Sequence, residues 1–474
     1  MSKKQQQVVG GKKNVTPAAG QKHAKARKAA EYPVFHSSAA GIDIGAREIF
    51  VAVPADRDDH PVRRYDTFTC DLREMAEWLK RCGVTTVAME STGVYWIPVY
   101  DMLEEHGIQA CLVNPRNMKN VPGKRTDFHE CQWIQHLHSM GLLHAAFRPD
   151  ENVRAVRVVM RNRNDLVGMR SQHVQHLHKA LTQMNIQVHH VIDDITGLTG
   201  MSILNAIVAG ERDPSVLAKL RDPRVKASEE IVRKSLEGNW RNEQISVLRQ
   251  RLSLWHRYSE LISECDREIE KLIAAFEPKV DPEVKPMPED RKAKQRRRRK
   301  KSGDPDYDMR TEAYQLFGID LTQIPGLMML VFMLFSEVGR DMSRWPTAGH
   351  FVSWLGLCPD NDISGGKVLW RGARRTKNRA GTLFRLAASS LHRDPGEMGN
   401  YLRRMKAKLG PKAATTATAH KIAVIFYTMV KNQVEYDASL WAKRDAMREK
   451  RLEAKLHKQA ALRGYKLVPM EPAA

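Results

Sequence analysis

The sequence lacks paired cysteines, long apolar runs and an apolar leader, and each absence excludes a class of protein. Its 6 cysteines are scattered and form no CxxC pair, so neither a zinc ribbon nor a disulfide framework is indicated, and a reducing compartment fits. The longest apolar run, from Leu327 to Phe335, is too short to span a bilayer. Residues 1–30 are rich in Lys, Gln and Ala and contain no apolar segment, unlike a secretory signal.

Positive charge is what the sequence has in excess. There are 77 Lys and Arg residues against 55 Asp and Glu residues, which gives a net charge of +22 over 474 residues. Such a charge favours a polyanionic partner, and nucleic acid is the first candidate. Hydrophobic residues make up 42% of the chain, which is enough for real cores, and the length suggests about two to four domains.

Changes of composition along the chain predict six segments. The basic arm and the basic linker are predicted to be disordered, and each either contacts phosphates or is only solvated. In the α/β segment, strands alternate with helices, which predicts parallel pairing in part of the sheet. The predicted segments are a disordered basic arm (1–34), an α/β domain (35–148), a helical, coiled-coil region (149–276), a basic disordered linker (277–312), a C-terminal domain (313–440) and a charged tail (441–474).

The middle segment is predicted to be mostly helical, and its second long helix spans about residues 243–275. That helix has a heptad seam, which Ser259 and Asp266 interrupt. Two arrangements fit the seam: a helical hairpin within one chain, or a coiled coil that joins two chains. In the C-terminal domain, Ile324-Pro325-Gly326 resembles the turn of a helix-hairpin-helix, whose backbone amides can hold a DNA phosphate.

The stretch Gly41-Ile42-Asp43-Ile44-Gly45 places a carboxylate in an apolar, β-branched strand. Burying that charge is costly unless something compensates it, and a divalent metal is the usual compensation. Gly41 and Gly45 leave room for another backbone, a phosphate or a metal to come close. The alternative is an ordinary strand whose Asp43 lies at a turn.

Three further acids lie where a metal site would need them. Glu90 ends another buried strand, and Asp127 and Glu130 follow Thr126, which is predicted to be a helix N-cap. A spacing of three puts Asp127 and Glu130 on one helix face. Carboxylates from strand ends and a helix face can hold Mg²⁺ for phosphoryl transfer, and such hard oxygen ligands favour Mg²⁺ or Mn²⁺ over zinc. Taken singly, each acid fits the surface of a protein as well.

The motifs in combination resemble a known family. Residues 40–147 and 318–440 are similar to the two characteristic regions of the DEDD-type transposases of insertion sequences, relatives of the Piv invertases. Asp127 to Trp133 and Gly356-Leu357-Cys358-Pro359 resemble the subgroup with a longer central helical region. The resemblance implies a RuvC-like, ribonuclease H-like α/β fold for the first region, a mainly α-helical C-terminal transposase domain, and recombination guided by a structured non-coding RNA, called a bridge or seeker RNA.

The same resemblance assigns a role to Ser364, which matches the serine that bonds covalently to the DNA 5′ phosphate in such proteins. The glycines after Ser364 permit close approach of a phosphate. The spacing of residues around Ser364 alone favours a simple Gly/Ser turn. If Ser364 is the nucleophile, no histidine is placed near it as a base, so metals held by the acids would activate its hydroxyl. Five basic residues can stabilise negative charge on the reacting phosphate: Lys367, Arg371, Arg374, Arg375 and Lys377.

Two positions depart from the family pattern. Glu130 stands where the fourth acid is usually Asp, so its longer side chain requires adjusted metal geometry. Lys377-Asn378 stands where Gly-Asn is usual, which puts in doubt a tight turn there but not the reaction class.

Together with these observations, the resemblance implies an RNA-guided DNA transposase or recombinase that cuts and rejoins strands through a serine–DNA intermediate. Mg²⁺ or Mn²⁺ would be held by Asp43, Glu90, Asp127 and Glu130. The expected partners are donor and target DNA, a structured guide RNA and further copies of the chain, from dimer to tetramer. The expected location is the bacterial cytoplasm, at the nucleoid, with no membrane association. Two alternatives stay open: a RuvC-like structure-specific nuclease that uses metal-activated water, and a basic RNA-binding protein without enzymatic activity.

Overall fold

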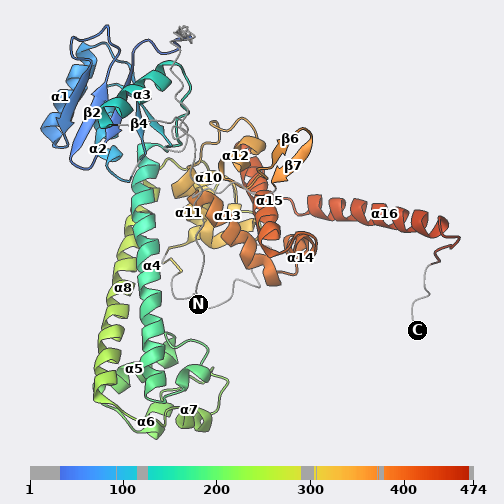
Figure 1. Cartoon of the computed structure of the whole chain (residues 1–474). Helices are drawn as coiled ribbons and strands as arrows, with labels where there is room; N and C mark the ends of the chain where they lie inside the picture. The colour runs from blue at the N-terminus through green and yellow to red at the C-terminus, as the bar shows by residue number, and fades with distance from the viewer. Residues whose placement is uncertain are drawn as a thin grey trace, which may run out of the picture. The chain divides into compact units, whose positions relative to one another are not determined.

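The computed structural model describes residues 33–91, 93–114, 126–289, 304–305, 307–370, 372 and 378–468. The described chain divides into two compact units, one that ends at Arg148 and one that begins at Pro149 (Figure 1). Each unit is described by itself below. The basic arm up to residue 32, residues 290–303 of the basic linker, and Arg371, Arg374, Arg375 and Lys377 lie outside the described residues.

A five-stranded mixed sheet with the order β3-β2-β1-β4-β5 forms the centre of the first unit. β1 pairs antiparallel with β2 and parallel with β4, and β4 pairs parallel with β5. The parallel pairing predicted from the alternation of strands and helices is confirmed, and a mixed five-stranded sheet with helices is the expected ribonuclease H-like arrangement. The strands are β1 (Ala39–Ile44), β2 (Glu48–Ala52), β3 (Val62–Asp66), β4 (Thr86–Glu90) and β5 (Gln109–Val113).

Three helices cover the two faces of this sheet: α1 (Thr69–Arg81), α2 (Trp96–Glu105) and α3 (Asp127–Ser139). Alternate residues of a strand point to opposite faces. Ile42 and Met89 belong to the core shared with α1 and α2, whereas Ala88 packs with Ile134 of α3. Alternation therefore places Asp43 and Glu90, the residues that follow Ile42 and Met89, on the face that α3 covers.

Gly41 allows α3 to lie close to β1. A Cβ atom at Gly41 would lie 2.2 Å from the backbone nitrogen of Gln135 and 2.4 Å from the carbonyl oxygen of Cys131. The room predicted at Gly41 is therefore occupied by the backbone of α3. Gly45 also makes room for backbone, because its N–H donates to the carbonyl of Glu48 at 3.0 Å in the β1–β2 turn.

A substitution at Gly41 tests this close approach. Gly41→Ala is expected to lower the free energy of unfolding by about 3 kcal/mol, because α3 must move away from the added methyl group. Gly168→Ala is the control, since Gly168 lies in a helix with open space around it and should gain about 1 kcal/mol from helix propensity. Thermal melting with hydrogen exchange of α3 measures both changes; unchanged protection of α3 in Gly41→Ala would contradict the packing argument.

The second unit begins with a long helical hairpin, in which α4 (Glu151–Gln183) packs along α8 (Asn242–Ala274) over 33 residues each (Figure 1). Of the two arrangements predicted for the heptad seam, the structure shows the intramolecular hairpin. The two polar residues that interrupt the seam have partners on α4. Ser259 accepts a hydrogen bond from Arg170 at 3.2 Å, and Asp266, which is 2% exposed, accepts from Arg163 at 2.5 and 3.2 Å.

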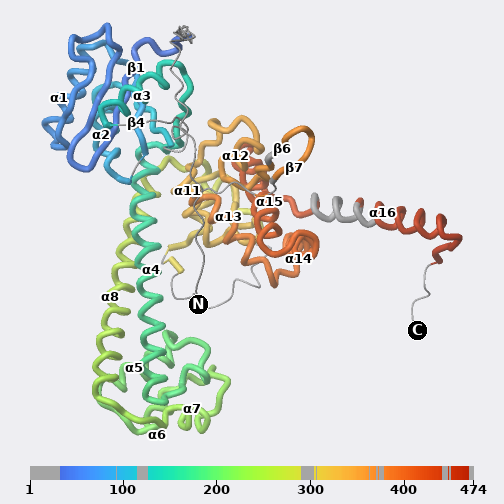
Figure 2. The backbone as a smooth tube through the Cα atoms, viewed as in Figure 1, coloured from blue at the N-terminus to red at the C-terminus, as the bar shows by residue number. Residues whose placement is uncertain are grey.

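A small helical cap closes the end of the hairpin where the chain passes from α4 to α8 (Figure 2). Its core contains Leu177, Leu204 and Leu248, which come from α4, α5 and α8. The small-residue segment between Gly197 and Gly210 forms α5. The elements of the cap are η2 (Val188–His190), α5 (Leu198–Ala209), α6 (Pro214–Ala218) and α7 (Glu229–Ser235).

The C-terminal region is mainly helical, as expected. Phe351, Phe384 and Phe426 pack together in its core, from α12, α13 and α15. Its elements are α10 (Met309–Phe317), η3 (Leu321–Gln323), η4 (Met328–Leu330), α11 (Val331–Val338), α12 (Ala348–Trp354), β6 (Asp362–Ser364), β7 (Lys367–Trp370), α13 (Arg379–Ser390), η5 (Leu391–Arg393), α14 (Glu397–Leu409), α15 (Pro411–Asn432) and α16 (Ser439–Ala461).

The turn at Pro325-Gly326 has a packing role. A Cβ atom at Gly326 would lie 2.5 Å from the carbonyl oxygen of Ala387 in α13, and Pro325 is buried. The glycine of this turn is therefore needed for packing against α13, and the predicted likeness to a phosphate-binding helix-hairpin-helix turn stays a prediction. Among the described helices, none has the length and apolar content needed to cross a membrane.

Candidate functional site

Two of the four predicted acids lie side by side at the ends of neighbouring parallel strands. The β1–β4 register pairs Gly41 with Ala88 and Ile42 with Met89, so Asp43 and Glu90 occupy the next position on each strand. Neighbouring strands are about 4.8 Å apart. Both carboxylates stand on the face of the sheet that α3 covers.

The other two acids lie in the first turn of α3. Thr126 occupies the N-cap position, as predicted, and its carbonyl accepts hydrogen bonds from the N–H groups of His129 and Glu130. Asp127 and Glu130 follow in the first turn, where the positive end of the helix dipole favours carboxylates. Since α3 packs on β1, its first turn brings these two side chains toward Asp43.

The charges of the four acids interact. The pKa of Asp43 is raised to about 6, first by burial and then by the negative charges of Glu130, Asp127 and Glu90. Such mutual repulsion is what a bound cation would relieve. Within the described residues, however, no three acidic, histidine or cysteine side chains are close enough together to hold a metal ion. The structure thus brings the four predicted acids into one electrostatic cluster without a formed coordination site.

Three residues of α3 that hold the helix against the sheet were not predicted to do so from the sequence. His138 is buried and its Nε2 lies 2.9 Å from the hydroxyl of Thr86 in β4. Gln135 donates to the carbonyl of Ala39 at 3.2 Å. Burial, and to a smaller extent the charge of Asp43, raises the pKa of the Cys131 thiol to about 12, so this thiol is unreactive. The helical spacing of Cys131 and His138 was the signal that could have identified this buried face.

The pKa of Asp43 predicts a pH dependence of stability. A raised folded-state pKa means that Asp43 binds its proton more tightly in the folded chain, so its contribution is largest below the unfolded value of 3.8 and is lost as the pH rises through about 6. Without metal, the difference between the melting temperatures of the wild type and of Asp43→Asn (wild type minus variant) should therefore decrease as the pH rises from 3.8 to about 6. The subtraction matters because buried His138, with a pKa lowered to about 4, has the opposite effect on stability.

Metal ions should reverse this trend. A cation binds the ionised carboxylate, so Mg²⁺ should raise the melting temperature of the wild type above about pH 6 and have little effect well below it. Melting curves with Mg²⁺ and with a chelator measure the difference. An equal effect of Mg²⁺ on Asp43→Asn would place its binding elsewhere.

Ser364 lies beside the tip of an exposed hairpin formed by β6 and β7. Ser364 pairs with Lys367 across the hairpin, and Gly365 and Gly366 form the two-residue turn between them. Both glycines have positive φ angles, 56° and 77°, as a type I′ turn requires. An added Cβ at either glycine would meet no described atom within 4 Å, so this turn is open to a large partner. Lys367 is exposed, and the other four predicted basic residues lie outside the described ones.

The structure gives Asn378 of the unusual Lys377-Asn378 pair a local role. The side chain of Asn378 caps α13, accepting from the N–H of Gly381 at 2.9 Å and donating to the carbonyl of Trp354 at 3.1 Å. The asparagine therefore fixes the start of α13 after the basic segment.

Comparisons with known proteins agree with the two regions singled out by their motifs. The family model of DEDD transposases of the IS110 group, described as "Transposase", matches residues 40–186. A second model, described as "Transposase IS116/IS110/IS902 family", matches residues 320–403. No curated protein matches the chain. The first match contains the four acids, and the second contains Ser364.

Proposed function

We propose that this chain, a transposase of the IS110 type and therefore an enzyme that cleaves and rejoins DNA strands, acts through a serine–DNA intermediate under the direction of a structured guide RNA. The observation that carries the proposal is the acid cluster, in which burial and then the charges of Glu130, Asp127 and Glu90 raise the pKa of Asp43. Four carboxylates are not brought together around a half-buried strand end for stability, because their charges repel one another.

The acid cluster is proposed to bind Mg²⁺ or Mn²⁺. The donors are all carboxylate oxygens, which suit these hard cations better than zinc. Asp43 and Glu90 are held by the sheet, whereas Asp127 and Glu130 can adjust with the first turn of α3. A cation bound there would supply charge neutralisation at the reacting phosphate.

Ser364 is proposed to be the nucleophile. Its exposed position beside an open glycine turn gives a DNA phosphate access to the hydroxyl, and Lys367 across the hairpin offers positive charge to the phosphate oxygens. Attack by Oγ on phosphorus forms a bond to the 5′ phosphate and releases a 3′ hydroxyl, which takes up a proton. Attack by a 3′ hydroxyl then reverses the step, so rejoining needs no ATP.

The guide RNA and the assembly are supported by the net charge of +22 and by the family resemblance. Strand exchange requires several cuts, so a dimer or a tetramer is proposed, acting at the bacterial nucleoid. Sequencing the RNA that copurifies with the chain tests the guide: one abundant structured species supports it, and a random sample of cellular RNA contradicts it. A metal-dependent nuclease would cut without a protein–DNA adduct, which separates that alternative.

A further inference from the structure

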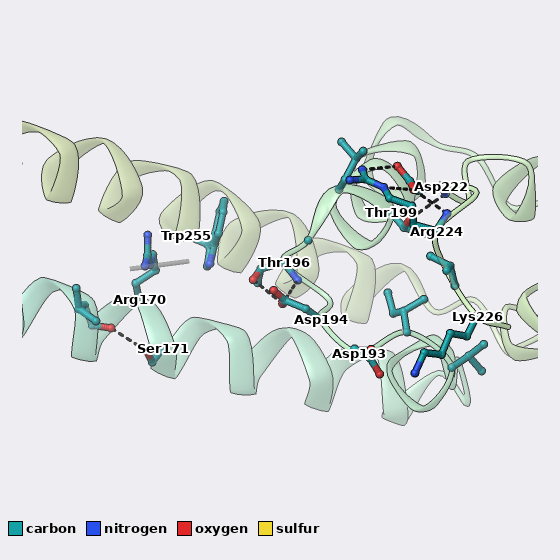
Figure 3. A pocket seen from close by; sticks show the side chains of 16 residues that line it. Arg170, Ser171, Asp193, Asp194, Thr196, Thr199, Asp222, Arg224, Lys226 and Trp255 are labelled. Atoms are coloured by element: carbon teal, nitrogen blue, oxygen red, sulfur yellow. Dashed lines mark hydrogen bonds and ion pairs between the residues drawn. The ribbon is translucent and has the colours of Figure 1, made fainter. Parts of the chain in front are cut away.

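A cavity of about 1030 Å³ lies at the capped end of the helical hairpin, outside both proposed catalytic regions (Figure 3). It is lined by α4, α8 and the segments around α5, and its volume is at the upper end of the range for small-ligand sites. Arg170 and Trp255 stand at one end, and Asp222 and Lys226 stand toward the other (Figure 3).

Arg170 carries a buried positive charge in the wall of this cavity. Its side chain is only 8% exposed, and burial, followed by the charge of Arg163, lowers the pKa of its guanidinium. Nη1 donates to the hydroxyl of Ser259 at 3.2 Å. Among the described residues, no carboxylate lies within ion-pair distance of Arg170. The charge of Asp266 offsets part of the lowering of this pKa. A buried guanidinium without an ion-pair partner is still costly, so an anion would be stabilised beside it.

Each pair of facing residues on α4 and α8 forms a layer of the hairpin, and the layer next to Arg170 contains the ion pair that Arg170 lacks. Arg163 precedes Arg170 by seven residues on α4, and Asp266 follows Ser259 by seven residues on α8, so the two layers are equivalent. Arg163 is paired with Asp266 at 2.5 Å. At the layer that borders the cavity, serine takes the place of the carboxylate. Arg170, which lines the cavity, therefore has a serine as its partner where Arg163 has a carboxylate.

Trp255 supplies an unpartnered donor on the same wall. Its indole Nε1 is buried and has no hydrogen-bond partner in the described structure, and the guanidinium of Arg170 lies 5.7 Å from its ring. A buried indole N–H normally has an acceptor. A buried indole N–H without an acceptor, beside a buried guanidinium without an ion-pair partner, indicates a ligand rich in anionic oxygen.

The remainder of the cavity suits an organic group larger than the anion. Val167, Ile192 and Leu198 give it apolar walls, and among its carboxylates Asp222 lies toward the end away from Arg170 (Figure 3). Asp222 is paired with Arg224, and Asp194 accepts from the backbone and hydroxyl of Thr196. Carboxylates can also accept from the amino groups of a nucleobase.

We propose that this cavity binds a phosphorylated nucleoside, with the phosphate at Arg170 and Trp255 and the base between the apolar walls. The ligand is either a free nucleotide or an unpaired nucleotide of a strand, since both present the same chemistry. The proposal is independent of the serine and acid chemistry.

Equilibrium dialysis of the full chain with the four labelled nucleoside monophosphates tests the site, with inorganic phosphate as a competitor. The wild type is expected to bind at least one nucleotide about tenfold more tightly than phosphate. Ser259→Asp should weaken this binding about tenfold or more, because it gives Arg170 the partner that Arg163 already has. Arg170→Gln should have the same effect. Ser259→Asp is expected to keep its fold, because the hairpin already accommodates a carboxylate at the equivalent position, Asp266.

Arg257→Gln is the matched control, because it also lowers the net charge by one on the same hairpin, at an exposed residue. It should bind nucleotides like the wild type. The same three proteins tested on short single-stranded oligonucleotides identify the source: a loss confined to oligonucleotides in Ser259→Asp supports a strand, and a loss with mononucleotides supports a free nucleotide. Equal binding of every probe by Ser259→Asp and Arg257→Gln, or phosphate binding as tight as that of the nucleotides, would overturn the proposal.

Discussion

Asp43→Asn is expected to reduce DNA strand cleavage by roughly three orders of magnitude while the fold is kept. Asparagine has the shape of aspartate, so Ile42 and the neighbouring strands keep their packing. Asparagine lacks the negative charge that a cation needs. The substitution also removes a charged carboxylate that burial and three neighbouring acids disfavour. Without metal, the variant should therefore melt no lower than the wild type above about pH 6. Cleavage of labelled DNA and thermal melting measure the two effects.

Two further variants define what the acid site requires. Asp66→Asn is the control, because Asp66 is an exposed acid of the same sheet that pairs with Arg64 at 3.1 Å; it should cleave normally. Glu130→Asp should retain more activity than Glu130→Ala, since a shorter carboxylate can still reach a cation if α3 shifts. Near-normal cleavage by Asp43→Asn would rule out the acid cluster as the catalytic metal site.

Ser364→Ala is expected to abolish recombination while binding of DNA and RNA is kept. The change removes one exposed hydroxyl, and the Gly365-Gly366 turn that sets the hairpin does not depend on it. The alanine variant lacks the nucleophile, and another hydroxyl could replace it only by reaching the same phosphate. The recombination rate should therefore fall by more than about 1000-fold. Strand-transfer assays and gel-shift titrations measure the two properties separately.

Ser353→Ala provides the comparison for this variant, because Ser353 is an exposed serine of the neighbouring α12. It should recombine DNA at the wild-type rate. Recombination by Ser364→Ala at a comparable rate would return Ser364 to the role of a simple turn residue and favour metal-activated water as the nucleophile.

The sequence was sufficient for features that depend on local pattern. The alternation of strands and helices predicted parallel pairing in part of the sheet, which the structure shows between β1 and β4 and between β4 and β5. The spacing of Asp127 and Glu130 predicted their common place in the first turn of a helix. Each of these inferences needs only the periodicity of one element and the polarity of the next.

Features that depend on distant packing could not be predicted. The backbone that fills the space at Gly41 belongs to Gln135 and Cys131, which are far away in the sequence. Ser259 and Asp266 read as breaks in a heptad seam, because their partners on α4 are known only once the hairpin register is known. Likewise, the sequence Pro325-Gly326 predicts a turn but does not show that this turn packs against α13.

The covalent intermediate is the central claim, and mapping it tests that claim most directly. The wild-type chain is incubated with DNA labelled at the phosphate of the cleavage site, denatured, and digested to peptides. The account predicts a labelled peptide that contains Ser364, together with a free 3′ hydroxyl on the released strand. A label on a tyrosine, or complete cleavage without any protein-bound label, would contradict it.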